Sequence, residues 1–315
     1  MNSLGPSADL LGAQPAPAAS PALAAGQPPV LRTLIRREFW EHRSLWIAPL
    51  SVAGLLLLGA IIGKVNFDSS LAALPEQRRA LFGVGMAYAA LPQFITLAII
   101  TWMYAGDCLY TERKDRSILF WKSMPVSDTL TVLSKLLVVM VVVPLGVYLV
   151  SAATTLLMSG IYLVRAWEDH SGEVFWDAGT WLRIQGTSLI ALVVAVLWYA
   201  PVTALLMLVS AWARRSVQLW VLLPPVVLIM MERIALGTHH VMDVVFYRLG
   251  AVFAEGGADF PGADGAAGHG RTLNLLFANI DPLPMFANVD LWLGLLVAAL
   301  LIVATIRIRQ YRDDT

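Results

Sequence analysis

The chain has 315 residues, of which 58% are hydrophobic and only 14% are charged, and its mean hydropathy is +0.69. A soluble domain has roughly 45–50% apolar and about 25% charged residues, so this composition excludes an ordinary soluble fold and predicts a membrane protein. The formal net charge is zero, which gives no electrostatic basis for binding nucleic acid. Cys108 is the single cysteine, so the chain cannot form an internal disulfide.

The N-terminal segment, residues 1–30, differs in composition from the rest. It is rich in Ala, Pro, Gly and Ser, and Asp9 is its only charged residue. Such a segment cannot bury enough apolar surface to offset the entropy of ordering, so we expect a disordered tail. It lacks the basic start and unbroken apolar run of a signal peptide. Residues 31–315 are expected to form one membrane domain.

Six apolar runs are candidates for membrane spans, because a helix needs about 20 apolar residues to cross the hydrocarbon core. The runs are continuous rather than alternating, which favours helices over the strands of a β-barrel. We therefore predict an all-α polytopic fold with six transmembrane helices. The last two runs are short, so their flanking residues Glu232, Arg233, Arg307 and Arg309 are expected at the membrane interfaces. The predicted spans are 45–63, 80–106, 136–164, 184–213, 216–231 and 291–306.

Lysine and arginine predict the orientation of these spans. If the N-terminus is cytoplasmic, 14 of the 22 Lys and Arg residues fall in inside segments, as the positive-inside rule requires. The pair Arg214-Arg215, between two long apolar runs, is the strongest local marker. Both termini are thus predicted to be cytoplasmic. In the third and fourth spans, Pro144, Gly146 and Pro201 are the expected kink sites.

Residues 31–43 precede the first span and resemble an amphipathic helix. Leu31, Leu34, Ile35 and Phe39 recur at helical spacing, whereas the arginines fall elsewhere. The pattern favours a helix on the cytoplasmic membrane surface whose arginines bind anionic lipid. The alternative is that these residues form only the first turn of the first span.

The segment 108–128, between the second and third spans, is too charged to cross the membrane. It nevertheless contains the apolar cluster 118–121, and charges beside a compact apolar patch suit docking onto another protein. The alternative is that Phe120 and Trp121 anchor the segment to lipid headgroups. Pro125 is expected to end one helix, and Ser127 or Asp128 can cap the next one.

The region 234–289 is the longest predicted extramembrane segment, and it lies on the outer side. Phe246, Leu249, Val252 and Phe253 in it predict a short amphipathic helix. The glycine-rich residues 256–270 are expected to be mobile, and the proline-containing run 281–286 suits a re-entrant or interfacial turn.

The chain contains no phosphate-binding GxxxxGK[ST] loop and no HExxH, GxSxG or paired-cysteine motif, so we expect neither ATP hydrolysis nor a bound cofactor or metal. His239, His240 and Asp243 leave open an intramembrane metalloenzyme as an alternative. The scarcity of charge within the spans disfavours ion-coupled transport.

Three side chains of the fourth span are candidates for a substrate path. Gln185, Trp198 and Tyr199 could line such a path, although helix packing is the alternative for each of them.

One stretch resembles a known family. Glu112-Arg113, followed by Ser117, Leu119, the run 124–127 (Met-Pro-Val-Ser) and Lys135, is similar to the permease subunits of ABC-2 type transporters. Arg116-Ser117 stands where the family often has Gly-Thr. The general plan of residues 31–312 also resembles that family.

The resemblance implies a transport function that needs partners. A permease of this family works with a separate ATPase subunit, which binds the ATP, and with a second permease copy or a sister permease. The expected protein is an exporter in the bacterial inner membrane, and the alternative is a non-transporting assembly or signalling subunit. The resemblance makes segment 108–128 similar to the coupling helix that contacts the ATPase. It assigns that contact to Glu112, Arg113, Arg116, Ser117, Phe120, Trp121 and Pro125.

Overall fold

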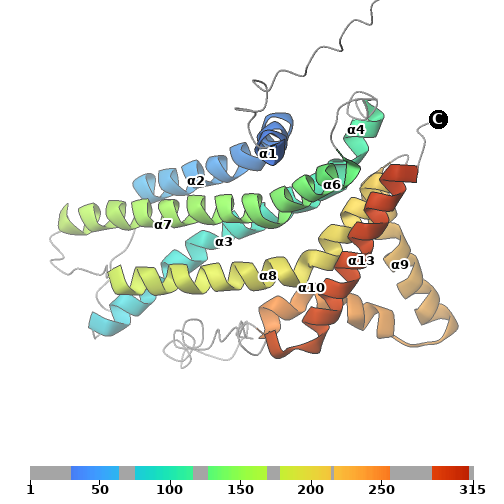
Figure 1. Ribbon diagram of the computed structural model, residues 1–315. Coiled ribbons are helices and arrows are strands. Elements are labelled where there is room, and N and C mark those ends of the chain that lie inside the picture. Colours follow the sequence, from blue (N-terminus) through green and yellow to red (C-terminus); the bar gives the residue numbers. More distant parts are fainter. Residues whose placement is uncertain are drawn as a thin grey trace, which may run out of the picture.

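The computed structural model is built from helices (Figure 1). Within the described residues every regular element is a helix, and none is a strand. The predicted N-terminal tail and the glycine-rich stretch of the outer region lie outside the described residues, as do the pair Arg214-Arg215 and the proline-containing run up to residue 285. The structure describes residues 30–63, 75–115, 127–168, 178–213, 216–255 and 286–311.

Among the described residues, six helical stretches are long and apolar enough to cross a membrane. They confirm the six predicted spans and indicate an integral membrane protein. Many of their large apolar side chains face outward, for example Leu55 at 68% and Ile62 at 76% exposure, as lipid-facing residues do. The helices are α2 (Ser44–Ile62), α3 (Pro75–Asp107), which α4 (Tyr110–Lys114) follows, α6 (Asp128–Leu137) with η3 (Val138–Val142) and α7 (Val143–Glu168), α8 (Ala178–Trp212), α9 (Val217–Ala235) and α13 (Val289–Tyr311).

The third span is longer than its apolar run, because helical structure begins at Asp128 and includes Lys135. Its 38 residues measure about 57 Å at 1.5 Å per residue, whereas the hydrocarbon core is about 30 Å thick. The span also changes its hydrogen-bond pattern in η3, a π-helical turn at Val138–Val142. Pro144 follows directly and has no N–H for the carbonyl of Met140, so the irregular turn lies just before this predicted kink site.

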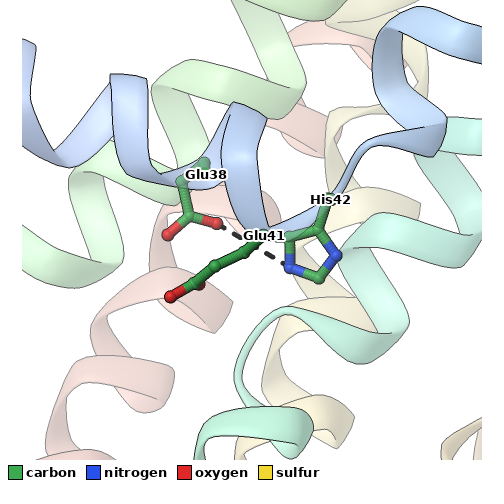
Figure 2. Close-up of side chains that lie close together, drawn as sticks. All are labelled: Glu38, Glu41 and His42. Carbon is green, nitrogen blue, oxygen red and sulfur yellow. Dashed lines mark ion pairs between the residues drawn. The ribbon is translucent and has the colours of Figure 1, made fainter.

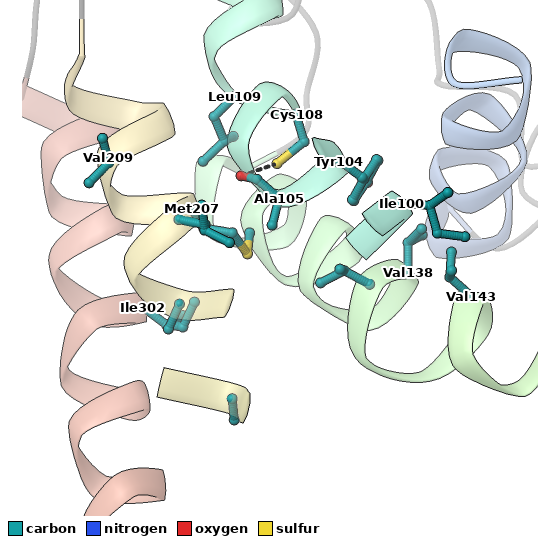
Figure 3. Close-up of a cluster of buried hydrophobic side chains, with 14 of the residues drawn as sticks. Ile100, Tyr104, Ala105, Cys108, Leu109, Val138, Val143, Met207, Val209 and Ile302 are labelled. Atoms are coloured by element: carbon teal, nitrogen blue, oxygen red, sulfur yellow. Dashed lines mark hydrogen bonds between the residues drawn. The ribbon is translucent and has the colours of Figure 1, made fainter. Parts of the chain in front are cut away.

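The helices pack around a shared apolar core. α13 packs against α8, and α2 and α3 pack against α7. Figure 3 shows the largest cluster of buried side chains, which draws on α3, α7, α8 and α13. Ala105, Val138 and Met207 in this cluster are fully buried. Small residues such as Ala105 and Ala204 let the helix backbones approach closely, which is the main way that helices associate in membranes.

Two further helices are not spans. α1 (Val30–Glu41) lies beside α6 at one end of the bundle, which we call the α1 end, together with α4 and the last turns of α13 (Figure 1). The helix breaks at His42 before α2 begins, so α1 is not the first turn of the first span. α10 (His240–Glu255) covers the helix predicted in the outer region, and it packs against α8 and α9.

Candidate functional site: a buried ion-pair cluster

Charged side chains from four helices meet in the interior at the α1 end. Glu38 of α1, Glu112 of α4, Lys135 of α6 and Arg309 of α13 are 2%, 4%, 0% and 7% exposed, respectively. Removing an ion from water costs several kcal/mol unless partners compensate for the lost hydration. These four residues, which we call the buried ion-pair cluster, supply two negative and two positive charges and therefore balance one another.

Lys135 is at the centre of the cluster. Its Nζ lies 2.7 Å from Oε1 of Glu38 and 3.1 Å from Oε1 of Glu112. The second oxygens of these carboxylates also have donors, because Tyr104 donates its hydroxyl to Glu38 at 2.8 Å and Arg309 donates to Glu112 at 2.8 Å. All four carboxylate oxygens are thus satisfied, which a stable buried charge requires.

The edge of the cluster reaches water. Arg309 also donates to Oδ1 of Asp128 at 2.9 Å, and the Asp128 side chain is 25% exposed. Ser127, rather than Asp128, caps α6, because its Oγ accepts a hydrogen bond from the N–H of Leu130. On the other side, Arg37 contacts both Glu112 and Glu41. The sequence had left Ser127 or Asp128 as the cap of α6. Because Ser127 caps the helix, the carboxylate of Asp128 is available to bind Arg309.

The short helix α4 is fixed on a second side by Arg113. The guanidinium donates to the carbonyl oxygens of Ser210 and Ala213, at 2.5 and 2.8 Å, at the end of α8. Cations are favourable at such C-terminal carbonyls. The hydroxyl of Ser210 accepts hydrogen bonds from the N–H groups of Leu109 and Tyr110. Two adjacent residues, Glu112 and Arg113, therefore fix α4 to α1, α6 and α13 on one side and to α8 on the other.

The structure brings together Glu112, Arg113 and Lys135, all of which the family resemblance had marked. Arg309, for which the sequence predicted only a place at the membrane interface, turns into the bundle, whereas Arg307 is exposed. Glu38 was not predicted, although it lies on the same helical face as Leu34 and Ile35 and so carried a signal. The other predicted coupling residues, Arg116, Ser117, Phe120, Trp121 and Pro125, lie outside the described residues.

Glu38, Glu41 and His42 form a group with metal-ligand chemistry. Figure 2 shows the three side chains, whose ligand atoms all lie within 4.8 Å of one another. However, Glu38 already binds Lys135 and Tyr104, and Glu41 binds Arg37. Lys135 and Arg37 supply the positive charge that a metal ion would bring. We therefore interpret this group as part of the ion pairs around the buried cluster and not as a metal site.

His42 rests with its ring edge-on to Tyr104, at 5.0 Å between centroids. Burial lowers the pKa of His42, and nearby Glu38 only partly opposes that effect. A lowered pKa makes the neutral ring the dominant form at neutral pH, so His42 adds no charge to the cluster.

The histidines of the outer region are placed differently. His239, His240 and Asp243 form no three-ligand group among the described residues. The N–H of His240 instead donates to Glu232, at 2.8 Å, and the N–H of Val241 donates to the same carboxylate at 2.7 Å. Glu232 therefore satisfies the first N–H groups of α10 and joins it to α9. The metalloenzyme alternative gains no geometric support from these contacts.

A second polar junction joins α8, α10 and α13. Trp198 is fully buried, and its indole N–H donates to the carbonyl of Arg248 at 2.8 Å. Arg248 in turn donates to the carbonyl of Trp198 at 2.8 Å, and its guanidinium carbon lies 4.3 Å from the centroid of the indole. Tyr199 donates to the carbonyl of Leu249 at 2.6 Å. Trp198 and Tyr199 thus hold α10 against the middle of α8.

Arg248 also attaches α10 to α13. It donates to the carbonyl of Asp290 at 3.1 Å, and its guanidinium packs on the backbone of Gly294, where a Cβ atom would overlap it. Partial burial lowers the pKa of Arg248, and the charge of Asp290 opposes this effect. Only glycine leaves room for this approach at position 294.

Gln185 lies apart from this junction. It donates to the hydroxyl of Thr155 at 3.2 Å and joins α7 to α8. Thirteen residues of helix, about 20 Å, separate it from Trp198. The structure therefore brings together Trp198 and Tyr199 but not Gln185, and each of the three side chains makes contacts between helices.

In comparisons with family models, curated proteins and solved structures, no match to this chain was found.

Lys135 is expected to be the least replaceable member of the cluster. Lys135→Met leaves two buried carboxylates without their shared cation, and removing one partner of a buried pair costs about 3–5 kcal/mol. Thermal unfolding in mild detergent should therefore begin at a clearly lower temperature. Arg307→Met is the matched control, because Arg307 is exposed on α13 and surface substitutions change stability by about 0.5 kcal/mol or less. Equal unfolding temperatures for the two variants would contradict a structural role for the buried ammonium.

Gly294→Ala is expected to loosen α10 from α13, while the hydrogen bonds of Trp198 and Tyr199 still join α10 to α8. The new methyl group would displace the guanidinium of Arg248, and hydrogen bonds from charged donors contribute about 1.5–3 kcal/mol each. Backbone amides of α10 should then exchange with solvent faster, as measured by hydrogen–deuterium exchange. Gly186→Ala on α8, where the added methyl meets open space, should leave that exchange unchanged. The same exchange rate in both variants would show that Arg248 does not hold α10.

Proposed function

We propose that the chain is the transmembrane permease subunit of an ABC-2 type ATP-driven transporter and that it works with a separate ATPase subunit. The observation that carries the proposal is the attachment of Glu112, whose carboxylate binds Lys135 and Arg309 at 3.1 and 2.8 Å. Glu112 lies within segment 108–128, which the family resemblance makes similar to the coupling helix that contacts the ATPase, and residues 116–126 of that segment lie outside the described residues. Helix α4 is part of this segment, and its ion pairs fix the segment to the membrane domain.

Two contacts would let a movement of this segment reach the spans. Glu112 links α4 to α1, α6 and α13, and Arg113 links α4 to the end of α8. ATP binding would close the ATPase pair and push on segment 108–128. Because α4 is held on both sides, the push would move these helices together and shift the bundle between two packed arrangements. Substrate would leave between this chain and a second permease copy or a sister permease, and the family resemblance implies export.

We infer that both termini and the α1 end face the cytoplasm, with α1 on the surface of a bacterial inner membrane. Six spans return the chain to the side on which it began. The α1 end carries the exposed arginines Arg32, Arg36 and Arg43, and positive charge marks the cytoplasmic side. This orientation also puts segment 108–128 on the side where ATP is available.

Copurification tests the function directly. The tagged chain, extracted in mild detergent, should bring down a stoichiometric ATPase subunit that hydrolyses ATP. Phe120→Ala combined with Trp121→Ala should remove that subunit, because the two side chains form the apolar part of the proposed contact. Trp220→Ala, at an aromatic residue that is 46% exposed on α9, should retain it. A stable chain without any ATPase would overturn the permease assignment in favour of a non-transporting membrane subunit.

Cysteine labelling tests the orientation, because the native Cys108 is buried and should not react. Leu236→Cys and Tyr311→Cys introduce thiols at positions that are 72% and 75% exposed, at opposite ends of the spans. In intact cells a membrane-impermeant maleimide should label Leu236→Cys alone, and Tyr311→Cys should react only after permeabilisation. The reverse pattern would place the coupling segment away from ATP and would exclude the proposed function.

A further inference from the structure

α1 has two opposite faces. Leu34 and Glu38 are buried, four residues apart, against the bundle. Arg32, Arg36 and Trp40, also four residues apart, are exposed. At 100° per residue these three positions fall within an arc of about 80°, and the buried pair lies about opposite. Arg43, exposed just after the helix, continues the same face. We call Arg32, Arg36, Trp40 and Arg43 the basic face of α1.

The arginines of the basic face have charges that none of the described residues neutralises. Arg32, Arg36 and Arg43 form no ion pair with any residue that the structure describes. Arg37, which lies between the two faces, by contrast contacts Glu41 and Glu112. Unneutralised arginines on one side of a short helix favour an anionic partner.

The aromatic residue of this face indicates which partner it is. Trp40 is 67% exposed, and the guanidinium carbon of Arg36 lies 5.9 Å from its ring centroid. Trp46, in the first turn of α2, is 45% exposed. Tryptophan is enriched at the level of lipid headgroups, and arginine near the surface binds their phosphates. Because α1 leads directly into the span α2, its basic face lies at the depth of the headgroups.

The course of α1 brings the whole face to one depth. In Figure 1 α1 is seen nearly end-on, whereas α2 runs across the view, so the two helix axes cross steeply. A helix that crosses a span steeply runs along the membrane surface, as interfacial amphipathic helices do. The three arginines can then reach headgroups of a single leaflet.

We propose that the basic face of α1 binds the headgroups of anionic phospholipids and that this binding positions Glu38 in the buried ion-pair cluster. Glu38 lies on the opposite face of the same three-turn helix, 2.7 Å from Lys135 and 2.8 Å from Tyr104. Lipid that holds the outer face therefore also holds the carboxylate on the inner face. The inference rests on the proposed placement of α1 at the membrane surface, and it does not depend on transport or on an ATPase.

A fluorescent label beside the basic face provides the test. Thr33 is exposed on α1 and Cys108 is buried, so Thr33→Cys can be labelled specifically in the full-length chain. After reconstitution in phosphatidylcholine bilayers, quenching by spin-labelled phosphatidylglycerol is compared with quenching by spin-labelled phosphatidylcholine. We expect the anionic lipid to quench several-fold more strongly, because each surface arginine favours it on the order of fivefold.

Two variants separate the basic face from general surface charge. Arg36→Gln combined with Arg43→Gln should remove most of the preference for phosphatidylglycerol. Arg307→Gln, at an exposed arginine of α13 at the same end of the bundle, should preserve it. Equal quenching by the two lipids in the parent protein, or an equal preference in both variants, would overturn the proposal. The proposal would also be overturned if a protein that copurifies with the chain covered the label and abolished its quenching by lipid, because the basic face would then bind that protein.

Hydrogen exchange tests separately whether lipid binding to the basic face positions Glu38 in the buried ion-pair cluster. Phosphatidylglycerol should slow hydrogen exchange at the backbone amides of α1 in the parent protein but not in the Arg36→Gln, Arg43→Gln variant. Unchanged exchange in the parent would overturn the part of the proposal that concerns Glu38. None of these measurements requires ATP, so a negative result leaves the copurification test of the proposed function intact.

Discussion

A buried ammonium group that cannot be left without partners determines how one end of this protein is assembled. Lys135 has no exposed surface and is compensated by Glu38 and Glu112, at 2.7 and 3.1 Å. The two carboxylates come from α1 and α4, and Arg309 from α13 completes the charge balance. Such a cluster adds little net stability compared with apolar packing, but any arrangement that separates its members costs several kcal/mol. In a bundle whose core is otherwise apolar, this penalty disfavours any arrangement that separates the four residues.

The contacts that fix α4 beside the buried ion-pair cluster and the polar junction around Trp198 share two helices, α8 and α13. α8 carries Ser210 at the α1 end and Trp198 near its middle, and α13 carries Arg309 and Gly294. α8 and α13 therefore form a common frame to which α4 is attached at one place and α10 at another. Fifteen residues of α13, about 22 Å, separate its two attachment points.

The spans could be predicted from the sequence, because long apolar runs are a property of composition and need no knowledge of neighbouring helices. The cluster could be predicted only in part. The family resemblance marked Glu112 and Lys135. It could not identify Arg309, because Arg307 is the same residue type two positions away, and only the structure shows that Arg307 is exposed and Arg309 is buried. Which of them points inward depends on how α13 packs against α8, and that rotation is a tertiary property. Glu38 was the one missed residue with a local signal, since its helical position matched that of buried Leu34.

The distribution of the cluster along the chain has a consequence for biogenesis. Glu112 and Arg309 are separated by 197 residues, and a chain is synthesised and folds from its N-terminus. Lys135 follows Glu112 by less than one span and can neutralise part of the charge of Glu38 and Glu112 as soon as the third span enters the membrane. Asp128 and the second oxygen of Glu112 must wait for Arg309, which belongs to the sixth span. A chain that stops short of this span would keep an excess of negative charge in the buried cluster, and this excess would distinguish truncated from complete molecules.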